Sequence, residues 1–349
     1  MVRERPILGI SPGDPAGIGP EITVKALLNP EIRERAVPVV YCDRVVLEDA
    51  LALTGGALTL RAVTDPREAV GEKGFVEYVD TGILKKGDYE YGRVNAVPGE
   101  ASFRYVVAAI VGAMAGHTSG VVTGPISKEA VNLAGHRFSG HTEIFAHYTG
   151  AERYRMFLSA RGTRGSLNVI HVTTHVSLRG ACDLVTKDRV LDTIRFADRA
   201  ARLMGKTERR IGVAGLNPHA SENGLFGDEE ARAIIPAIAA ARIEGLDAEG
   251  PLPPDTVFVK ALGGFFDVVV AMYHDQGHIP LKMLGFDMNA GALSRIRGVN
   301  ATIGLPIIRT SVDHGTAFDI AGKNQAGEES MLDAMDMALT FIENSRPVL

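Results

Sequence analysis

The sequence contains only two cysteines, Cys42 and Cys182. This number excludes a disulfide scaffold and a four-cysteine zinc site, and it suits a reducing compartment. No apolar run is long enough to cross a membrane, and the first residues lack the apolar core of a signal peptide. The net charge of −5 provides no basic surface for nucleic acid. We therefore expect a cytoplasmic protein with neither a nucleic-acid partner nor a membrane partner.

The rest of the composition is that of an ordinary globular protein, with 46% hydrophobic and 23% charged residues. A length of 349 residues predicts one large or two medium domains. Segments typical of buried strands alternate with segments typical of helices. The strands are expected at residues 6–10, 37–41, 120–123, 167–172, 211–216 and 268–272, and the longer helices at 100–116, 187–204, 228–244 and 330–344. This alternation predicts an α/β fold with a largely parallel sheet.

Three of the expected strands each lead into a histidine. These are His175 after residues 167–172, His219 after 211–216 and His274 after 268–272. Ligands bind beyond the carboxyl ends of strands in open α/β sheets, and imidazole is the commonest protein ligand of zinc-like metals. For any one of these histidines alone, a lone loop residue is the simpler interpretation. Three in the same structural position favour a shared divalent-metal site.

Other polar groups occupy similar positions. Asp275 and Lys282 follow the strand at 268–272, where ligands are expected. A helix start at residues 139–143 either holds an anion or is a plain helix start. Arg309 is suited to bidentate binding of a carboxylate or phosphate. The glycine- and proline-rich loop at residues 11–21 is either a tight turn or a place where backbone approaches a ligand, and it is not the dinucleotide-binding fingerprint.

Several motifs occur in order across nearly the whole chain. They lie at residues 13–21, 140–143, 216–219, 273–277 and 309–317. Together they resemble the 4-hydroxythreonine-4-phosphate dehydrogenase family. The segment 314–322 is also similar to the cofactor loop of isocitrate and isopropylmalate dehydrogenases.

The resemblance implies a fold and an assembly. The expected fold is α/β with two α/β/α domains and an active site in the cleft between them, as in isocitrate and isopropylmalate dehydrogenases. Domain 1 would comprise residues 1–127 and 300–349 and carry the cofactor loop. Domain 2, residues 128–299, would carry the metal ligands and the dimer contacts. Members of the family are homodimers whose metal site uses histidines of both subunits.

The resemblance also implies roles for individual residues. The metal ligands would be His175, His219 and His274. The substrate contacts would be His141, Thr142, Lys282, Asn300 and Arg309. The cofactor loop would contribute His314, Gly315, Thr316, Ala317, Asp319 and Gly322. The cofactor would be NAD, with NADP left open, together with a divalent metal ion such as zinc, magnesium, manganese or cobalt. Lys282 and Asp275 are both candidates to transfer protons.

Within the family, residues 169–175, 278–280 and 317–323 look more like a catabolic branch. That branch oxidises 4-phospho-D-threonate or 4-phospho-D-erythronate to dihydroxyacetone phosphate and carbon dioxide. The alternatives are the branch that serves vitamin B6 (pyridoxal phosphate) synthesis and a branch that acts on aromatic cis-dihydrodiols. A protein of another class, which binds metal and phosphate without redox chemistry or transfers an acyl or phosphoryl group, is also compatible with an α/β scaffold.

Two segments depart from the biosynthetic branch. The loop at residues 221–224 is glycine-rich there and reads Ser-Glu-Asn-Gly here. The segment 283–298 is longer than in that branch and contains Arg295 and Arg297. A longer segment next to Asn300 would alter the substrate pocket.

Overall fold

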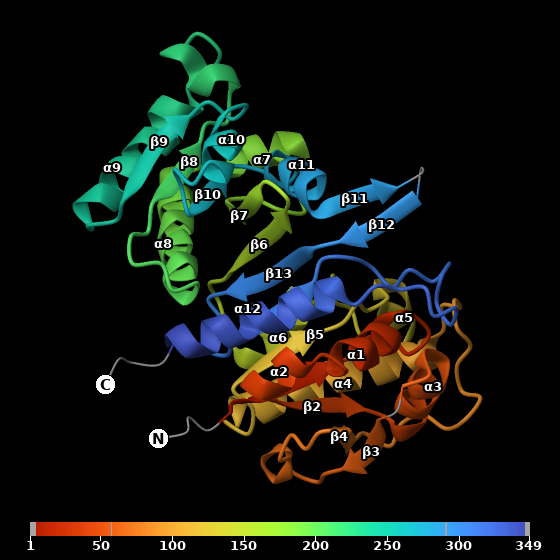
Figure 1. The fold of residues 1–349 in the computed structure, drawn as a ribbon. Coiled ribbons are helices and arrows are strands. Elements are labelled where there is room, and N and C mark those ends of the chain that lie inside the picture. Colours follow the sequence, from red (N-terminus) through yellow and green to blue (C-terminus); the bar gives the residue numbers. More distant parts are fainter. Residues whose placement is uncertain (1–4, 57, 290–291, 346–349) are drawn as a thin grey trace. The chain divides into compact units, whose positions relative to one another are not determined.

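The computed structural model describes residues 5–56, 58–289 and 292–345 (Figure 1). Contacts divide the chain into two compact units. Unit 1 comprises Met1–Glu152 and Leu305–Glu343, and unit 2 comprises Arg153–Gly304 and Asn344–Leu349. The sequence-based boundaries lie after residues 127 and 299, so residues 128–152 and 300–304 belong to the other unit by contacts.

The described part of unit 1 contains a parallel sheet in the order β3-β4-β2-β1-β5-β14. Its strands are β1 Ile7–Ser11, β2 Val37–Cys42, β3 Thr59–Ala62, β4 Phe75–Asp80, β5 Gly120–Thr123 and β14 Arg309–Val312. Every residue of β2, β5 and β14 is buried. Strands covered on both faces usually read as continuous apolar runs, which explains why β2 and β5 were visible in the sequence and the polar β14 was not.

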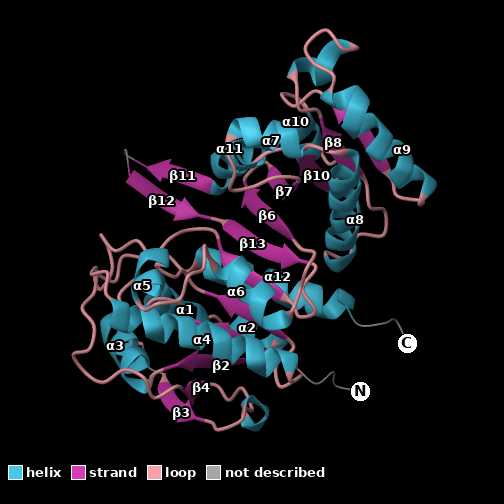
Figure 2. Cartoon of the chain, turned by 180° about the vertical axis from the view of Figure 1, so that it is seen from behind, coloured by secondary structure: helices cyan, strands magenta, loops and turns pink. Residues whose placement is uncertain are grey.

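Helices cover both faces of this sheet (Figures 1 and 2). They are α1 Gly19–Leu27, α2 Pro30–Arg35, α3 Arg44–Thr54, α4 Ala96–Met114, α5 Lys128–Leu133, α6 His141–Thr149 and α12 Glu329–Ser345. Neighbouring residues of β14 point to opposite faces. The guanidinium of Arg309 lies 5.4 Å from the ring centre of Phe145 on α6, and the Thr310 hydroxyl donates to the Ala334 carbonyl on α12 at 2.7 Å. Helices α6 and α12 therefore lie on opposite faces.

The sheet described in unit 2 has the order β13-β6-β7-β10-β8-β9. Its strands are β6 Arg155–Gly162, β7 Gly165–His171, β8 Ile211–Ala214, β9 Ala248–Leu252, β10 Val268–Ala271 and β13 Gly298–Ile303. Strands β7, β10, β8 and β9 are parallel, whereas β6 runs antiparallel to both of its neighbours. A separate antiparallel pair, β11 Phe286–Asn289 and β12 Ala292–Ile296, lies within the longer segment noted in the sequence.

A proline-rich segment of unit 2 forms a strand. The three prolines of residues 250–255 are typical of a stiff linker, yet residues up to Leu252 belong to strand β9. Strand β9 is at the edge of the sheet, where a proline does not remove a hydrogen bond from a central ladder. The sequence analysis predicted neither β6 nor β13. Because β6 runs antiparallel to both of its neighbours, the sheet is mixed rather than uniformly parallel.

The helices of unit 2 also lie on both faces of its sheet. They are α7 Leu178–Leu184, α8 Lys187–Leu203, α9 Ile235–Ile243, α10 Val257–Leu262 and α11 His274–Gly285. Val269 and Ala271 of β10 pack with residues of α10 and α11, so the alternating Val268 and Val270 face the other side, where α8 contacts the sheet. Gly277 allows α11 to approach β7, since a Cβ there would lie 2.4 Å from the His171 Nε2 atom.

Two further findings concern membrane-spanning helices and thiol groups. None of the described helices combines the length and apolar character needed to cross a bilayer. Cys42 is buried and Cys182 is partly buried, and both are free thiols.

Candidate functional site

The three strands that lead into the predicted metal ligands are neighbours in unit 2. Strand β10 pairs in parallel with β7 on one side and with β8 on the other. Their carboxyl ends therefore lie at one edge of the sheet, and His175, His274 and His219 follow shortly after these ends. The three strands expected from the sequence are present and adjacent in the sheet, and the metal site at their ends stays a prediction.

Two of the three predicted ligands come together. The imidazole centres of His175 and His274 are 5.7 Å apart. His274 is the first residue of α11, and its ring stacks on that of His278 with centres 3.6 Å apart. The ring of His171 lies 4.8 Å from that of His278. The sequence analysis did not assign His171 or His278, although His274 and His278 have the spacing of neighbours on one helix face.

Asp275 contacts the imidazole of His274. Its Oδ1 accepts a hydrogen bond from the Nδ1 of His274 at 2.6 Å. A carboxylate on one ring nitrogen fixes the tautomer and directs the other nitrogen toward a metal ion. This contact supports a positioning role for Asp275 beside its predicted role in proton transfer.

His219 lies in a loop of unusual backbone. Residues 219–223 all have positive φ angles, between 44° and 71°, which is strained for residues other than glycine. The carboxylate of Glu230 holds the loop by accepting from the backbone amides of Leu216 at 2.8 Å and Asn217 at 2.7 Å. The His219 ring has Phe226 beside it, with centres 6.4 Å apart. Backbone strain of this kind concentrates at functional sites.

A test of the metal hypothesis follows from these positions. Two imidazoles on one zinc-like ion, with metal–nitrogen bonds of about 2 Å, place their ring centres about 5–6 Å apart. His175 and His274 meet this geometry. Within the described ranges of this one chain, no three His, Cys, Asp or Glu side chains assemble into a metal-binding group. His175 and His274 are thus a pair of candidate ligands within one chain.

Lys282 and Asn300, the other predicted site residues of unit 2, lie on α11 and β13. The Lys282 ammonium is 4.6 Å from the ring centre of Phe286, a cation–π contact near the end of α11. The Oδ1 of Asn300 is buried and has no hydrogen-bond partner among the described residues. A buried acceptor of this kind is suited to a ligand that donates a hydrogen bond.

Unit 1 contains a buried cation at the start of β14. Arg309 is 3% exposed, donates to the Thr123 hydroxyl at 3.1 Å and lies near the Phe145 ring. Burial lowers the pKa of Arg309 to about 9, against the opposing effect of the Glu143 carboxylate. Keeping a guanidinium in such a place has a large desolvation cost, which an anionic ligand would offset.

His141 and Thr142 begin helix α6 in the same unit. Burial, then the charges of Arg309 and Lys128, hold the pKa of His141 well below its usual value. The imidazole is therefore neutral at physiological pH. Its Nε2 atom is buried and has no partner among the described residues. With the free amides of the α6 N-terminus, these groups form a candidate anion site.

The predicted cofactor turn packs against the glycine-rich loop before α1. The Ile18 amide donates to the Thr316 carbonyl at 3.0 Å, and a Cβ on Gly17 would lie 3.0 Å from Thr316. Ala317 has a φ of 43°. A Cβ added to Gly315 would meet no described atom within 4 Å. That open space fits close approach of a cofactor to the backbone.

Asp14, in the same loop, is a buried carboxyl that the sequence analysis did not assign. Its Oδ1 accepts from the Ala16 amide at 2.9 Å, and its Oδ2 is buried without a partner in the described structure. Burial raises the pKa of Asp14 from 3.8 to about 6, and hydrogen bonds from the backbone of Ala16 and Ser127 partly oppose the rise. A buried carboxyl with a raised pKa is typical of functional sites, and only its place in a glycine-rich loop could have indicated it from sequence.

Comparisons with known proteins agree with this architecture. Residues 34–338 match the family model described as Pyridoxal phosphate biosynthetic protein PdxA. The chain is 46% identical over 331 residues to the D-threonate 4-phosphate dehydrogenase of Cupriavidus necator, covering 95% of each chain. A crystal structure of 4-hydroxythreonine-4-phosphate dehydrogenase from Klebsiella pneumoniae matches with a TM-score of 0.84 and 43% identity, covering 97% of this chain and 99% of that one.

A more distant neighbour bears on the fold alone. The β-decarboxylating dehydrogenase TK0280 of Thermococcus kodakarensis superimposes with a TM-score of 0.51 at 15% identity, over 97% of this chain and 83% of that one. This likeness confirms the predicted fold class. From the family model and the two full-length relatives, we conclude that the chain belongs to the PdxA family and is an oxidoreductase.

Proposed function

We propose that the protein is an NAD-dependent, divalent-metal-assisted dehydrogenase that oxidatively decarboxylates 4-phospho-D-threonate or 4-phospho-D-erythronate. The products are dihydroxyacetone phosphate and carbon dioxide. The observation that carries the proposal is the buried Arg309 cation beside the neutral His141 imidazole, because this pair suits a phosphorylated acid. The identity to the Cupriavidus D-threonate 4-phosphate dehydrogenase supports the choice of substrate.

The substrate phosphate is assigned to unit 1. Arg309 would donate charge-assisted hydrogen bonds to it, and the α6 N-terminus and Thr142 would add neutral donors. The neutral His141 imidazole would donate through Nε2, the atom that lacks a partner in the described structure. Asn300 and Lys282 would contact the remaining polar groups of the substrate.

The metal ion is assigned to unit 2. His175 and His274 would hold it, with Asp275 orienting His274. His219 would come from the second subunit of a homodimer, since the described residues of one chain bring no third ligand to the pair. A divalent ion there would lower the pKa of the substrate hydroxyl and stabilise negative charge during decarboxylation.

The chemistry balances as an oxidation followed by loss of carbon dioxide. The C3 hydroxyl proton would pass to a base and the C3 hydride to the oxidised nicotinamide of NAD. The turn containing His314, Gly315, Thr316, Ala317, Asp319 and Gly322 would hold this cofactor. The resulting β-keto acid breaks its C1–C2 bond, and C2 then takes a proton to give dihydroxyacetone phosphate. Lys282 lies on α11 with the metal ligand His274, and we assign it the proton transfers, with Asp275 as the competing candidate.

The direct test is absorbance of reduced nicotinamide with purified protein, NAD and a divalent metal. The substrates tested in parallel are 4-phospho-D-threonate, 4-phospho-D-erythronate and 4-phosphohydroxy-L-threonine. We expect turnover of a phosphorylated hydroxy acid but not of the amino acid. Turnover of the amino acid alone would place the protein in vitamin B6 synthesis, and no turnover of any of the three would contradict the proposal.

A second experiment tests the shared metal site. His175→Ala and His219→Ala should each be inactive as homodimers. If His175 and His219 of one site come from different subunits, a refolded one-to-one mixture regains about a quarter of the wild-type activity, because half of the dimers are mixed and each mixed dimer has one intact site. If all three ligands come from one chain, mixing restores nothing. His147→Ala, a histidine on α6 outside the assigned site, is the control and should stay active.

One observation favours a second candidate. The Klebsiella structure carries the name of the biosynthetic activity, 4-hydroxythreonine-4-phosphate dehydrogenase, at 43% identity. Both substrates carry a phosphate on C4, so the cationic group of unit 1 suits either. The parallel assay above separates them.

A further inference from the structure

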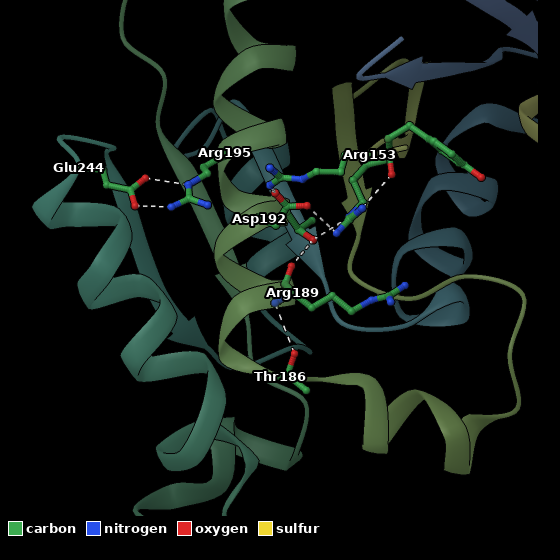
Figure 3. A network of polar contacts seen from close by, with 9 residues as sticks. Arg153, Thr186, Arg189, Asp192, Arg195 and Glu244 are labelled. Atoms are coloured by element: carbon green, nitrogen blue, oxygen red, sulfur yellow. Dashed lines mark hydrogen bonds and ion pairs between the residues drawn. The ribbon is translucent and has the colours of Figure 1, made fainter. Parts of the chain in front are cut away.

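Arginines gather along one face of helix α8 in unit 2. Asp192 of α8 lies between Arg153 and Arg195, and Arg195 turns toward Glu244 (Figure 3). An open hollow of about 520 Å³ lies over these residues. Its lining includes Arg153, Arg155, Asp188, Arg189, Asp192 and Arg195. A second hollow of about 320 Å³ shares three of them and adds Arg199. No residue of either hollow belongs to the proposed catalytic site.

Positive charge is in excess around these hollows. Among the residues described, five guanidinium groups line them, against the carboxylates of Asp188, Asp192 and the nearby Glu244. Asp192 pairs with Arg153 and Arg155, and Glu244 pairs with Arg195. Within the described ranges, no ion pair involves Arg189 or Arg199. Two cations are thus available to an added anion.

The guanidinium group of Arg155 lines the larger hollow and is held by several hydrogen bonds. Its side chain is 16% exposed and donates to Asp192 at 2.8 Å, to the Thr193 hydroxyl at 3.2 Å and to the Tyr154 carbonyl at 2.8 Å. Burial, then the charges of Arg189 and Arg153, lowers the pKa of Arg155 to about 10. The guanidinium groups therefore repel one another, and a bound anion would relieve this repulsion.

We propose that this arginine cluster is a second anion-binding site, which takes a small solute carrying two or more phosphate groups. Arg189 and Arg199 are ten residues apart on α8, which spans about 15 Å at about 1.5 Å per residue. Arg189 lines the larger hollow and Arg199 the smaller one, so a solute that meets both of these long side chains needs linked phosphates rather than a single one. The larger hollow has the size of an ordinary small-molecule pocket, and guanidinium forks match phosphate oxygens. The proposal goes beyond the dehydrogenase activity and does not depend on it.

The cluster is joined to the segment that carries a proposed metal ligand. The Nε of Arg189 donates to the Val172 carbonyl at 2.8 Å, just after β7 and shortly before His175. Arg153 and Gly304, which line the smaller hollow, are also the residues at which the chain enters and leaves the main part of unit 2. Binding of an anion to the arginine cluster is therefore expected to restrain the backbone of residues 172–175.

The test is calorimetric titration of the full-length protein with inorganic pyrophosphate at constant ionic strength. The variants are Arg189→Gln, Arg199→Gln and the double substitution, which break no ion pair. Each single variant should weaken pyrophosphate binding at this site about tenfold, the effect of one charge-assisted contact, and the double variant should lose the site. Binding at the unit 1 anion site would persist in the double variant, so the two sites are separable.

Arg44→Gln is the matched control, because Arg44 is an exposed helical arginine in unit 1 with a single ion pair. It should leave pyrophosphate binding unchanged. The proposal is overturned if the wild type binds no pyrophosphate, if Arg199→Gln and the double variant bind it as the wild type does, or if the control loses as much. Tighter binding of citrate than of pyrophosphate would overturn the assignment to phosphate. Arg199 is exposed, so its single variant is informative even if the double variant folds poorly.

Discussion

The two cationic regions of the molecule handle charge in opposite ways. In unit 1, Arg309 is 3% exposed and donates to a neutral hydroxyl on Thr123. In unit 2, Arg153 is 66% exposed and Arg195 is 44% exposed, and both pair with carboxylates. Buried charge has a large desolvation cost, whereas exposed pairs contribute little either way. The comparison teaches that the strength of an anion site depends on the burial of its cations more than on their number.

The first prediction concerns the buried cation. Arg309→Met should lower kcat/KM for the phosphorylated substrate about 100- to 1,000-fold, because two charge-assisted hydrogen bonds are lost in a site shielded from water. Arg309→Lys should recover only part of the loss, since an ammonium cannot replace the planar fork. Steady-state kinetics measure both variants. If the Met variant keeps the wild-type kcat/KM, Arg309 does not bind the substrate, and the contrast between the two cationic regions no longer holds.

The second prediction concerns Asp14, another buried charge of unit 1. Its pKa is raised from 3.8 to about 6, so the native state binds this proton more tightly than the unfolded state. The carboxyl contributes stability fully below pH 3.8, and that stability is lost as the pH rises through about 6. Asp14→Asn should therefore be more stable than the wild type above pH 6, by up to about 3 kcal/mol, with the difference vanishing below pH 3.8.

Urea denaturation across that pH window measures the difference for Asp14→Asn. Asp183→Asn, an exposed carboxylate on α7, is the control and should change stability little at any pH. If Asp14→Asn is less stable than the wild type at neutral pH, the carboxylate is held by more than the backbone amides seen here. The buried charges of unit 1 would then resemble the paired charges of unit 2.

Much of the fold could be predicted from the sequence, for a physical reason. Strands β2, β5, β8 and β10 are buried throughout and β7 is buried at its C-terminal end, so their apolar runs stand out. Strands β6 and β13 are less visible, since β6 carries polar residues such as Arg155 and Arg161 on a partly exposed face. The edge strand β9 could not be recognised from the sequence, because it contains Pro251, and proline is rare in strands. The boundaries between the units could not be read, because they depend on contacts and not on composition.

The candidate site was only partly predictable. Strand-end reasoning identified His175 and His274, which the structure brings together, because the carboxyl ends of neighbouring parallel strands share an edge. It could not show where His219 lies, since that depends on the strained loop after β8. The burial of His171 and Asp14 is not visible in any spacing rule, whereas the four-residue spacing of His274 and His278 could have indicated their ring contact. The arginine cluster combines residues from β6 and α8 that are separate in the sequence.

The third prediction addresses the carboxylate at the centre of the arginine cluster. Asp192→Asn should lower the free energy of unfolding by about 2 kcal/mol, because it leaves the mostly buried Arg155 with a neutral partner. The loss is smaller than for a fully buried pair, since Arg153 is largely in water. Chemical denaturation measures it, with Asp188→Asn in the exposed first turn of α8 as the matched control. An unchanged stability would show that the cluster is held by the neutral acceptors alone.

The fourth prediction has the smallest expected effect and sharpens the comparison most directly. Arg195 and Glu244 form a two-contact ion pair, but their side chains are 44% and 37% exposed. Arg195→Gln should therefore change stability by only about 0.5 kcal/mol. A double-mutant cycle with Glu244→Gln isolates the pair, and its coupling should stay below about 1 kcal/mol and shrink further at high salt. A coupling of about 2 kcal/mol or more would mean that water does not screen the surface of α8, and burial would no longer explain why Arg309 and Arg195 differ.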